Sequence, residues 1–211
     1  MNIRTIRTRA AALALPALAA GGLLTAIAPA AHAATDCLAT AQSGTALLGS
    51  QAAKTNTTLA ALNTASTPQQ ALATAQSVVT DLNVLSDGLA TTVVALSGCP
   101  ALNASDSQTV AAGYADAGDT AQAMLSTLIA KHVVFAQFGT TGPIAASLRQ
   151  LEGASDSYSF TIAELAPSQQ TAITATGTQL GNAVANDVSQ YEQICIPSPL
   201  YPAVQPICIS S

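Results

Sequence analysis

Few side chains in this sequence could do chemistry, and their spacing argues against catalysis. Beyond residue 33 there is a single histidine, His132, which follows Lys131 and precedes Phe135 by about one helical turn. A general base needs a nucleophile to activate and a group that orients it. The sequence contains no nucleophile elbow, phosphate-binding loop or zinc-binding helix motif. We therefore expect His132 to be a packing or surface residue, in a protein that is not an enzyme and uses no cofactor.

Carboxylates and cysteines are the remaining candidates for binding an ion. Asp116 and Asp119, like Glu152 and Asp156, are spaced to place two like charges on one face of a helix. Such pairs are usually solvated, and a bound cation is the alternative. The sequence has no close pair of cysteines and no Cys/His cluster, so disulfides are favoured over metal ligation. We predict no metal site.

The N-terminal segment predicts secretion. Three arginines precede an apolar run over residues 10–27, and Ala31-His32-Ala33 places small residues at both cleavage positions. This is the pattern of a signal peptide that is cleaved after Ala33, with an uncleaved membrane anchor as the alternative. We expect a mature chain without a transmembrane segment. The expected parts are a signal peptide (1–33), a helical bundle domain (34–195) and a proline-rich C-terminal tail (196–211).

Charge and cysteine content limit the partners and the compartment. The expected mature chain keeps Lys54, Lys131 and Arg149 against eleven carboxylates, a net charge of −8. This charge excludes the basic surface that nucleic acids or anionic membranes require. In an oxidising compartment the four cysteines predict two disulfides, and Asn56-Thr-Thr58 and Asn103-Ala-Ser105 are glycosylation acceptor patterns at Asn56 and Asn103.

Apolar residues recur at helical spacing and almost never alternate with a period of two. Thr67-Pro68-Gln69-Gln70 is a capping box that opens the second helix, and Ser105-Asp106-Ser107-Gln108 is expected to open the third. Pro143 and Pro167 are expected to start the fourth and fifth. Because short connections make antiparallel neighbours, we predict an all-α, up-and-down bundle of about five helices. The apolar stripes cover residues 38–62, 72–96, 110–138, 144–165 and 173–191.

The cysteines can be placed on this bundle. Four prolines follow Cys195 and preclude a helix there, so the simplest role of Cys195 and Cys208 is to staple the tail to itself. The start of the first helix lies beside the end of the second, which brings Cys37 near Cys99. We predict the disulfides Cys37–Cys99 and Cys195–Cys208.

The composition of the core offers a possible binding site. Stripe positions alternate large aliphatic residues with Ala, Thr, Ser and Gly, which indicates either close helix approach or an unfilled apolar cavity for a lipid chain. Lys131 lies on an apolar stripe, where it either snorkels to water or pairs with a fatty-acid carboxylate. In the second case the carboxylate would point to Lys131, and the acyl chain would lie among Leu82, Leu89, Met124, Leu128 and Phe135.

Part of the chain resembles a known family. The order and spacing of Lys131, Phe135, Leu148, Leu151, Phe160, Leu165-Ala166-Pro167 and Tyr191 resemble the fungal hydrophobic surface-binding protein A family, also called the cell-wall galactomannoprotein family. The resemblance implies a secreted, helical, non-enzymatic protein, extracellular or in the cell wall. It also implies adsorption to hydrophobic solid surfaces, binding of fatty acids between the helices, and in some members recruitment of a secreted polyester-degrading hydrolase. His132, where members often carry a second lysine, the four cysteines and the proline-rich tail depart from the family pattern.

Two other classes remain open. One is a secreted helical-bundle inhibitor of a cell-wall enzyme, which would resemble the plant invertase and pectin methylesterase inhibitors. Those proteins carry a cysteine-linked hairpin at the N-terminus, whereas Cys37 has no near partner in the sequence. The other is a structural cell-wall mannoprotein or antigen.

Overall fold

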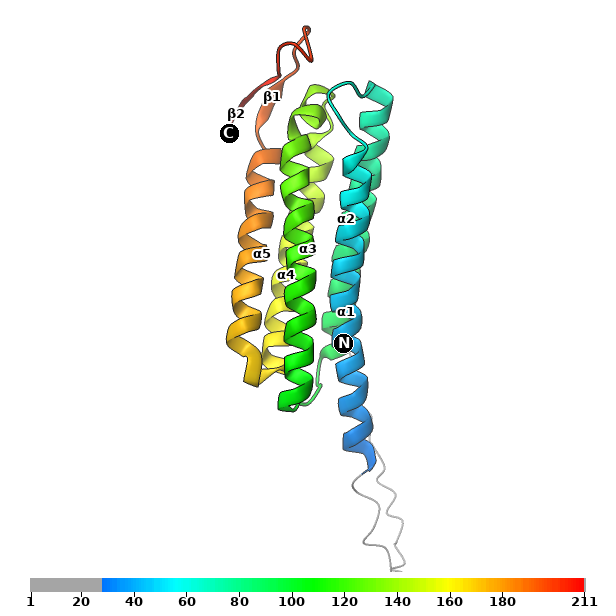
Figure 1. Cartoon of the computed structure of the whole chain (residues 1–211), viewed down its shortest axis with the longest axis vertical. Coiled ribbons are helices and arrows are strands. Elements are labelled where there is room, and N and C mark those ends of the chain that lie inside the picture. Colours follow the sequence, from blue (N-terminus) through cyan, green and yellow to red (C-terminus); the bar gives the residue numbers. More distant parts are fainter. Residues whose placement is uncertain (1–27, 211) are drawn as a thin grey trace, which may run out of the picture.

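The computed structural model describes residues 28–210 (Figure 1), and within them it contains five α-helices, one 3-10 turn and a two-stranded hairpin. The predicted all-α bundle is confirmed. The elements are α1 (Ala28–Ala60), α2 (Pro68–Leu96), α3 (Ala104–Gln137), α4 (Thr141–Leu165), η1 (Pro167–Gln169), α5 (Gln170–Tyr191), β1 (Ile194–Ile196) and β2 (Ile207–Ile209).

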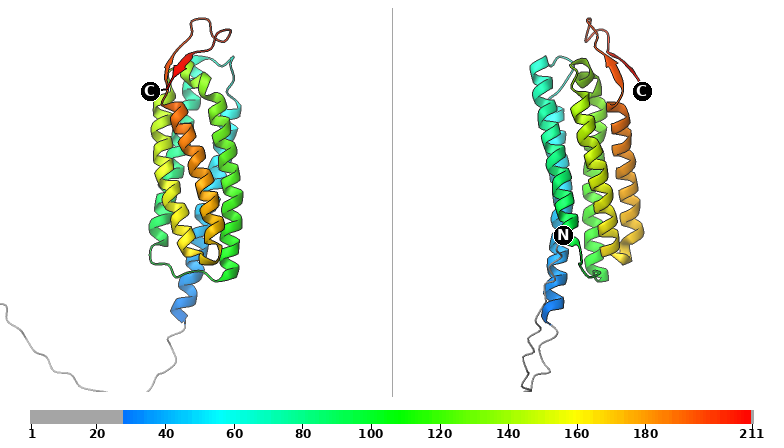
Figure 2. Two further views of the ribbon diagram at one scale, coloured as in Figure 1. Left: turned by 90° about the vertical axis from the view of Figure 1, so that its left-hand side faces the viewer. Right: turned by 180° about the vertical axis from the view of Figure 1, so that it is seen from behind.

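The helices alternate in direction, and their lateral order differs from their order in the chain. α1 packs on α2 and α3, α2 packs on α4, and α5 packs on both α4 and α3. The five helices therefore form a closed ring in the order α1, α2, α4, α5, α3 (Figures 1 and 2). α2 and α3 are consecutive in the chain, but they lie across the ring from each other, so their inner faces meet in its interior.

Local sequence explains most helix ends. The Thr67 Oγ1 accepts from the Gln70 amide at 3.3 Å and the Gln70 Oε1 accepts from the Thr67 amide at 2.8 Å, as the capping box predicts. The box expected at Ser105 is wrong. Asn103 is the N-cap of α3, and its Oδ1 accepts from the Asp106 amide at 2.9 Å. Asparagine caps a helix as well as serine does, so the helix starts at the earlier of the two candidates.

The two prolines do not start helices as expected. α4 begins at Thr141, so Pro143 lies within its first turn, where the missing amide hydrogen has no helical partner to lose. Pro167 begins the 3-10 turn, and α5 starts after it at Gln170. Gly98 and Gly139 adopt positive φ angles of 81° and 67° just beyond the ends of α2 and α3, where glycine is favoured.

Close helix approach explains several small residues in the core. A Cβ atom added at Gly44 would lie 2.9 Å from the ring of Tyr158, and one added at Gly177 would lie 2.8 Å from the Ser159 side chain. Such distances leave no room for a methyl group. The sequence left two explanations open for the small core residues, close helix approach and an unfilled cavity. At these two positions the glycines allow close helix approach.

The C-terminal tail folds as a short ribbon. β1 and β2 pair antiparallel with Cys195 opposite Cys208, and the structure joins these two cysteines and also Cys37 to Cys99, which is the predicted pairing. The sequence predicted only that this tail is not helical, and it did not predict the two strands of three residues each. The Gln137 side chain holds the ribbon on α3 by accepting from the Ser198 amide at 2.9 Å and donating to the Ser198 carbonyl at 3.0 Å.

Two predictions about membranes and processing remain open. The predicted cleavage site after Ala33 falls within the first turns of α1, and residues 1–27 of the predicted signal peptide lie outside the described residues. Among the described helices, α2 is long and apolar enough to cross a bilayer. It packs between α1 and α4, and a core helix of a bundle can have the same length and apolar composition as a membrane-spanning helix.

Candidate functional site

The apolar residues predicted to hold a lipid chain all point into the ring. Leu82 and Leu89 on α2, and Met124, Leu128 and Phe135 on α3, are completely buried members of one continuous core. Since α2 and α3 lie across the ring, the two sets approach its interior from opposite sides. All five predicted residues therefore belong to the same continuous core, which their own side chains and those of neighbouring residues fill.

Lys131 makes a contact that the sequence analysis did not foresee. Its Nζ donates to the carbonyl oxygen of Leu62 at 2.6 Å, just beyond the end of α1, and its side chain is half-buried. A cation at this position satisfies a carbonyl that the helix leaves free and opposes the helix dipole. The other two cations of residues 36–210 also have partners, since Lys54 Nζ lies 2.7 Å from Asp81 and Arg149 pairs with Glu192.

Three tyrosine hydroxyl groups tie helices together inside the ring. Tyr158 on α4 donates to the carbonyl of Ala41 on α1 at 2.7 Å. Tyr191 on α5 donates to the carbonyl of Leu128 on α3 at 2.7 Å, and the hydroxyl of Tyr114 on α3 lies 2.5 Å from the Ser159 hydroxyl on α4. Burial raises the pKa of all three phenols, so they stay neutral donors at any physiological pH.

Asp187 is a buried carboxyl group that the sequence analysis missed. It lies on the buried stripe of α5, one turn before Tyr191, has no exposed area, and neither of its carboxyl oxygens has a hydrogen-bond partner. Burial raises the pKa of this carboxyl to about 8. An aspartate on the otherwise apolar spacing Leu180, Val184, Asp187, Tyr191 was the feature of the sequence that could have revealed it.

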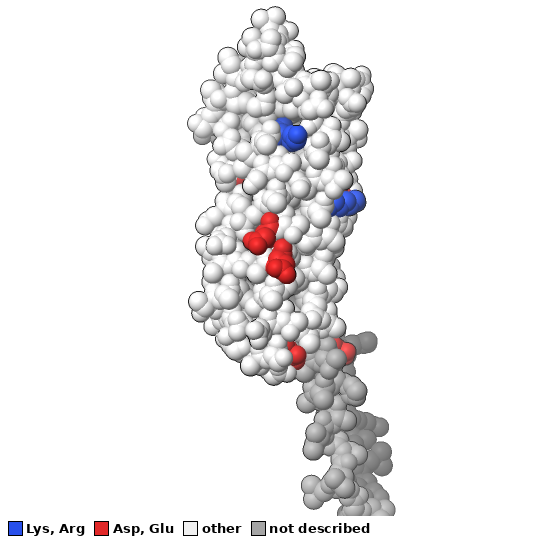
Figure 3. Space-filling view, viewed as in Figure 1, with Lys and Arg blue, Asp and Glu red and all other residues white. Residues whose placement is uncertain are grey.

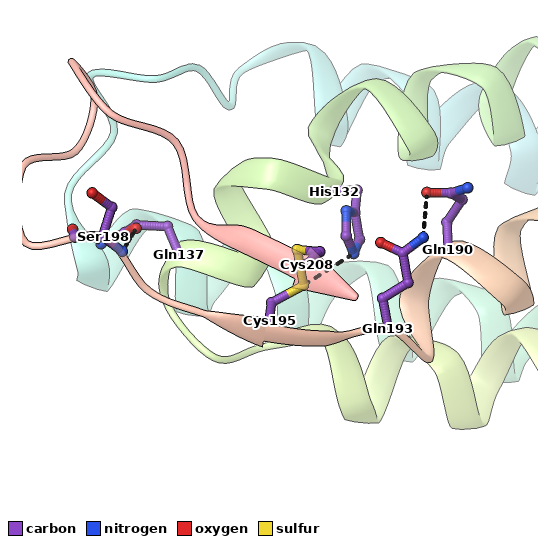
Figure 4. Close-up of a disulfide and its surroundings, with 7 residues drawn as sticks. All are labelled: His132, Gln137, Gln190, Gln193, Cys195, Ser198 and Cys208. Carbon is purple, nitrogen blue, oxygen red and sulfur yellow. Dashed lines mark hydrogen bonds between the residues drawn. A yellow bond between two sulfur atoms is a disulfide. The ribbon is translucent and has the colours of Figure 1, made fainter. Parts of the chain in front are cut away.

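His132 is buried between α5 and the hairpin, as expected of a packing residue. Its ring meets Tyr191 edge-on at a centroid distance of 5.0 Å, and burial lowers its pKa, which keeps the imidazole neutral. Its Nε2 lies 4.0 Å from the Cys195 Sγ (Figure 4). The fold therefore creates a His132, Cys195, Cys208 cluster that the sequence did not show, but both sulfur atoms belong to the disulfide here, and metal ligation requires thiolates.

Two open grooves run along the outside of the ring, and the predicted carboxylate pairs lie on or beside them. The groove between α1 and α3 has a volume of about 430 Å³ and a floor of small residues. The groove between α4 and α5 has a volume of about 570 Å³ and carries Glu152, Asp156 and Glu164. Asp116 is the charged residue of the first groove, and Asp119 is exposed nearby. Neither lining includes a lysine or arginine, so an anionic head group would meet like charge in both.

The hairpin presents an exposed apolar face. The strand register places Ile194 opposite Ile209 and Ile196 opposite Ile207, so all four side chains lie on the same face, away from the disulfide. These isoleucines are between 57% and 66% exposed, and no charged residue follows Glu192 in the sequence. The end of the molecule that the hairpin forms is correspondingly free of charge in Figure 3. The repeated Ile-Cys-Ile in the sequence was the available hint of this face.

The two acceptor asparagines are in different settings. Asn103 is exposed at the start of α3, where its Nδ2 donates to the Asp106 carboxylate at 2.7 Å. Asn56 is half-buried in α1, and its side-chain oxygen has no partner. Attachment of glycans at either residue stays a prediction.

Comparison with known proteins shows the fold alone. No family model and no curated protein sequence matches the chain. Ligand-binding domain 1 of the Penicillium marneffei MP1 protein, solved with arachidonic acids, matches with a TM-score of 0.65 and 13% identity over 74% of this chain and 98% of that one. AFMP4P, solved with palmitic acid, matches with a TM-score of 0.64 and 17% identity over 73% of this chain and 99% of that one.

Proposed function

We propose that this protein is a secreted, non-enzymatic binder of long-chain lipids, fatty acids above all, and a member of the family that its sequence resembles. The observation that carries the proposal is the ring of five helices with an apolar interior, in a fold that two other proteins use while holding arachidonic or palmitic acid. The acyl chain would lie between the inner faces of α2 and α3.

The energetics favour such a site if the ring can open. Each methylene group transferred from water contributes about 0.8 kcal/mol, so ten of them supply roughly 8 kcal/mol to offset the cost of parting the helices. Met124 is fully buried among the predicted lining residues, and its flexible side chain adapts to a changed shape. Uptake therefore requires movement of helices rather than a preformed hole.

The seam between α1 and α3 is the proposed entrance. No loop connects these two helices directly, and the groove above their seam is lined by Ala46, Gly49, Gly113 and Ala117. Their short side chains leave the groove above this seam unfilled. The α4–α5 seam differs, because the short η1 turn joins those helices at one end.

Lipid uptake by delipidated protein tests this proposal. Native mass spectrometry of the secreted protein should reveal a bound lipid, and calorimetry should show binding of palmitic acid. Gly113→Leu fills the entrance groove and should slow uptake at least tenfold. Gly153→Leu is the matched control, since this exposed glycine of α4 has open space around it. Absence of bound lipid together with absence of palmitic acid binding would refute the function.

Secretion is a separate part of the proposal and rests on residues 1–33. Arg4, Arg7 and Arg9, the apolar run and the Ala-His-Ala ending support it. The protein recovered outside the producing cell, or from its wall, should begin at Ala34. Retention in the membrane fraction with an intact N-terminus would favour the anchor instead.

A second function, adsorption to apolar solids, is favoured by the isoleucine face of the hairpin. The strands are three residues long and flanked by Pro197 and Pro206, which limits pairing with a further strand. What remains for contact is the apolar side-chain face, and because no charged residue follows Glu192 in the sequence, an uncharged solid such as wax or polyester fits best. A polyester-degrading hydrolase is the partner that the family resemblance adds.

Partition onto polyester particles tests adsorption. Replacing the four isoleucines by threonine should reduce the bound fraction several-fold, whereas Val94→Thr, at an exposed site on α2, should not. Equal adsorption of both variants and the parent would exclude the hairpin as the contact. The hydrolase is tested separately, by whether it co-sediments with particles only when this protein coats them.

A further inference from the structure

Asp187 is a polar group inside an apolar ring with nothing to bind. More than nine in ten buried polar groups in folded proteins have a hydrogen-bond partner, and an unpaired one destabilises the fold. Both carboxyl oxygens of Asp187 are unpaired and its side chain is wholly buried. By contrast, the hydroxyl groups of Tyr114, Tyr158 and Tyr191 in the same interior all have partners.

Asp187 lies beside the proposed lipid site. Tyr191 follows it by one turn on the buried stripe of α5, donates to the Leu128 carbonyl and has its ring centroid 6.2 Å from that of Phe135. Leu128 and Phe135 are two of the residues predicted to line the acyl chain. The unpaired carboxyl therefore belongs to the same interior, at the α5 side.

No charged group on the neighbouring parts of α3, α4 and α5 stabilises the ionised form of the Asp187 carboxyl group. α5 packs on α3 and α4, and on these stretches the titratable residues are Lys131, His132, Arg149, Glu152, Tyr191 and Glu192. Lys131 directs its Nζ to the Leu62 carbonyl. Burial keeps His132 and Tyr191 uncharged, and Arg149 is paired with Glu192. With its own pKa raised to about 8 by burial, Asp187 is a carboxylic acid at neutral pH, with one O–H donor and one carbonyl acceptor.

We propose that Asp187 binds the carboxyl head group of the fatty acid, through a hydrogen bond in which the two carboxyl groups share one proton. This inference rests on the proposed lipid-binding function and names the group that orients the ligand. Two adjacent carboxyl groups in an apolar site hold one proton between them, because both cannot ionise together. Lys131, the residue first expected in this role, already donates to Leu62.

Three variants and two ligands test the inference. Asp187→Leu should lower the affinity for palmitic acid at least tenfold and leave the affinity for hexadecane unchanged within twofold. Asp187→Asn keeps an N–H donor and should hold palmitic acid within about threefold of the parent. Lys131→Met should bind both ligands as the parent does.

The pH dependence of palmitic acid affinity distinguishes head-group binding by Asp187 from a purely structural role, which would not change this dependence. Above about pH 8 the ligand-free protein loses the Asp187 proton that the two carboxyl groups would share, so the affinity of the parent for palmitic acid should fall, approaching tenfold per pH unit. Asp187→Asn should show no such fall. Asp187→Leu should also raise the melting temperature, because it removes an unpaired polar group from the core.

Failure of this inference and failure of the proposed function give different results. If Asp187→Leu binds palmitic acid as tightly as the parent, Asp187 is not the head-group ligand, although lipid binding stands. Loss of both ligands in Asp187→Leu, or a pH profile shared by the parent and Asp187→Asn, also overturns it. A fall with Lys131→Met alone assigns the head group to Lys131. If the parent binds neither ligand, the lipid-binding function itself is wrong.

Discussion

The bundle and the C-terminal hairpin treat apolar side chains in opposite ways. In the bundle, residues such as Leu89 and Leu128 point inward and are completely buried, and tyrosine hydroxyl groups form hydrogen bonds between helices. The hairpin turns its four isoleucines outward and relies on one disulfide and on Gln137 for its position.

This difference separates the two kinds of binding that we propose. An apolar ligand for the bundle must wait until helices part, so its binding rate reports on opening of the ring. An apolar surface can contact the hairpin at once, because its isoleucines are already in water. Changes to one region should therefore leave the activity of the other largely intact.

The largest expected difference between the regions is in the effect of their disulfides. Replacing Cys37 and Cys99 by serine frees a loop of 62 residues, and it should lower the free energy of unfolding by about 4 kcal/mol. Replacing Cys195 and Cys208 frees the short hairpin and should change bundle stability by less than about 0.5 kcal/mol. Denaturant unfolding followed by circular dichroism measures both. Equal losses would show that the hairpin and bundle unfold as one unit.

Truncation of one apolar side chain should have a smaller but equally uneven effect. Leu128→Ala leaves a cavity in the core and should cost about 3 kcal/mol. Ile196→Ala removes a side chain that already meets solvent, so its cost should stay below about 0.5 kcal/mol. Thermal unfolding of both variants gives the comparison, and a large loss in Ile196→Ala would mean that the isoleucine face supports the bundle.

The pH dependence of stability should come from the bundle. The pKa of Asp187 is raised from 3.8 to about 8, so the folded state binds this proton more tightly than the unfolded chain does. The free energy of unfolding should therefore fall as the pH rises from about 4 to about 8, with a limiting slope from this group of about 1.4 kcal/mol per pH unit. The difference between the parent and Asp187→Asn isolates this slope, and a pH-independent difference would contradict the assignment.

The smallest effect concerns the contact between the regions. Gln137→Ala removes both hydrogen bonds to Ser198 and should lower bundle stability by about 1 kcal/mol or less. Exchange of the Ser198 amide hydrogen should nevertheless accelerate about tenfold, because the hairpin loses its attachment. Gln190→Ala, which loses only a bond to Gln193 near the same site (Figure 4), is the control and should not change this exchange.

Much of the bundle could be predicted because its determinants are local. The spacing of apolar residues gives helices, and Thr67 with Gln70 fixes where α2 begins. The lateral order of the helices was not predictable in this way, since it depends on which faces meet once all five are present. The start of α3 was predicted wrongly because Asn103 and Ser105 are both good N-cap residues, and the sequence alone does not decide between them.

The candidate site was predicted less well than the fold. The direction of Leu82 and Met124 follows from their stripes, so their burial could be foreseen. The contact of Lys131 with the Leu62 carbonyl could not, because it joins residues 69 positions apart. The sequence places Asp187 on the apolar stripe of α5, but it does not show whether the carboxyl oxygens have hydrogen-bond partners. The packed structure shows that they have none.

The tyrosines give the protein a built-in optical reporter. The chain has four tyrosines and no tryptophan, so tyrosine dominates its near-ultraviolet absorption and fluorescence. Three of them join helices of the ring, and the fourth, Tyr201, lies in the hairpin against Phe138. In the Tyr201→Phe variant the hairpin would contribute no tyrosine fluorescence. The remaining tyrosine signal would then report whether the helices of the ring are closed or parted.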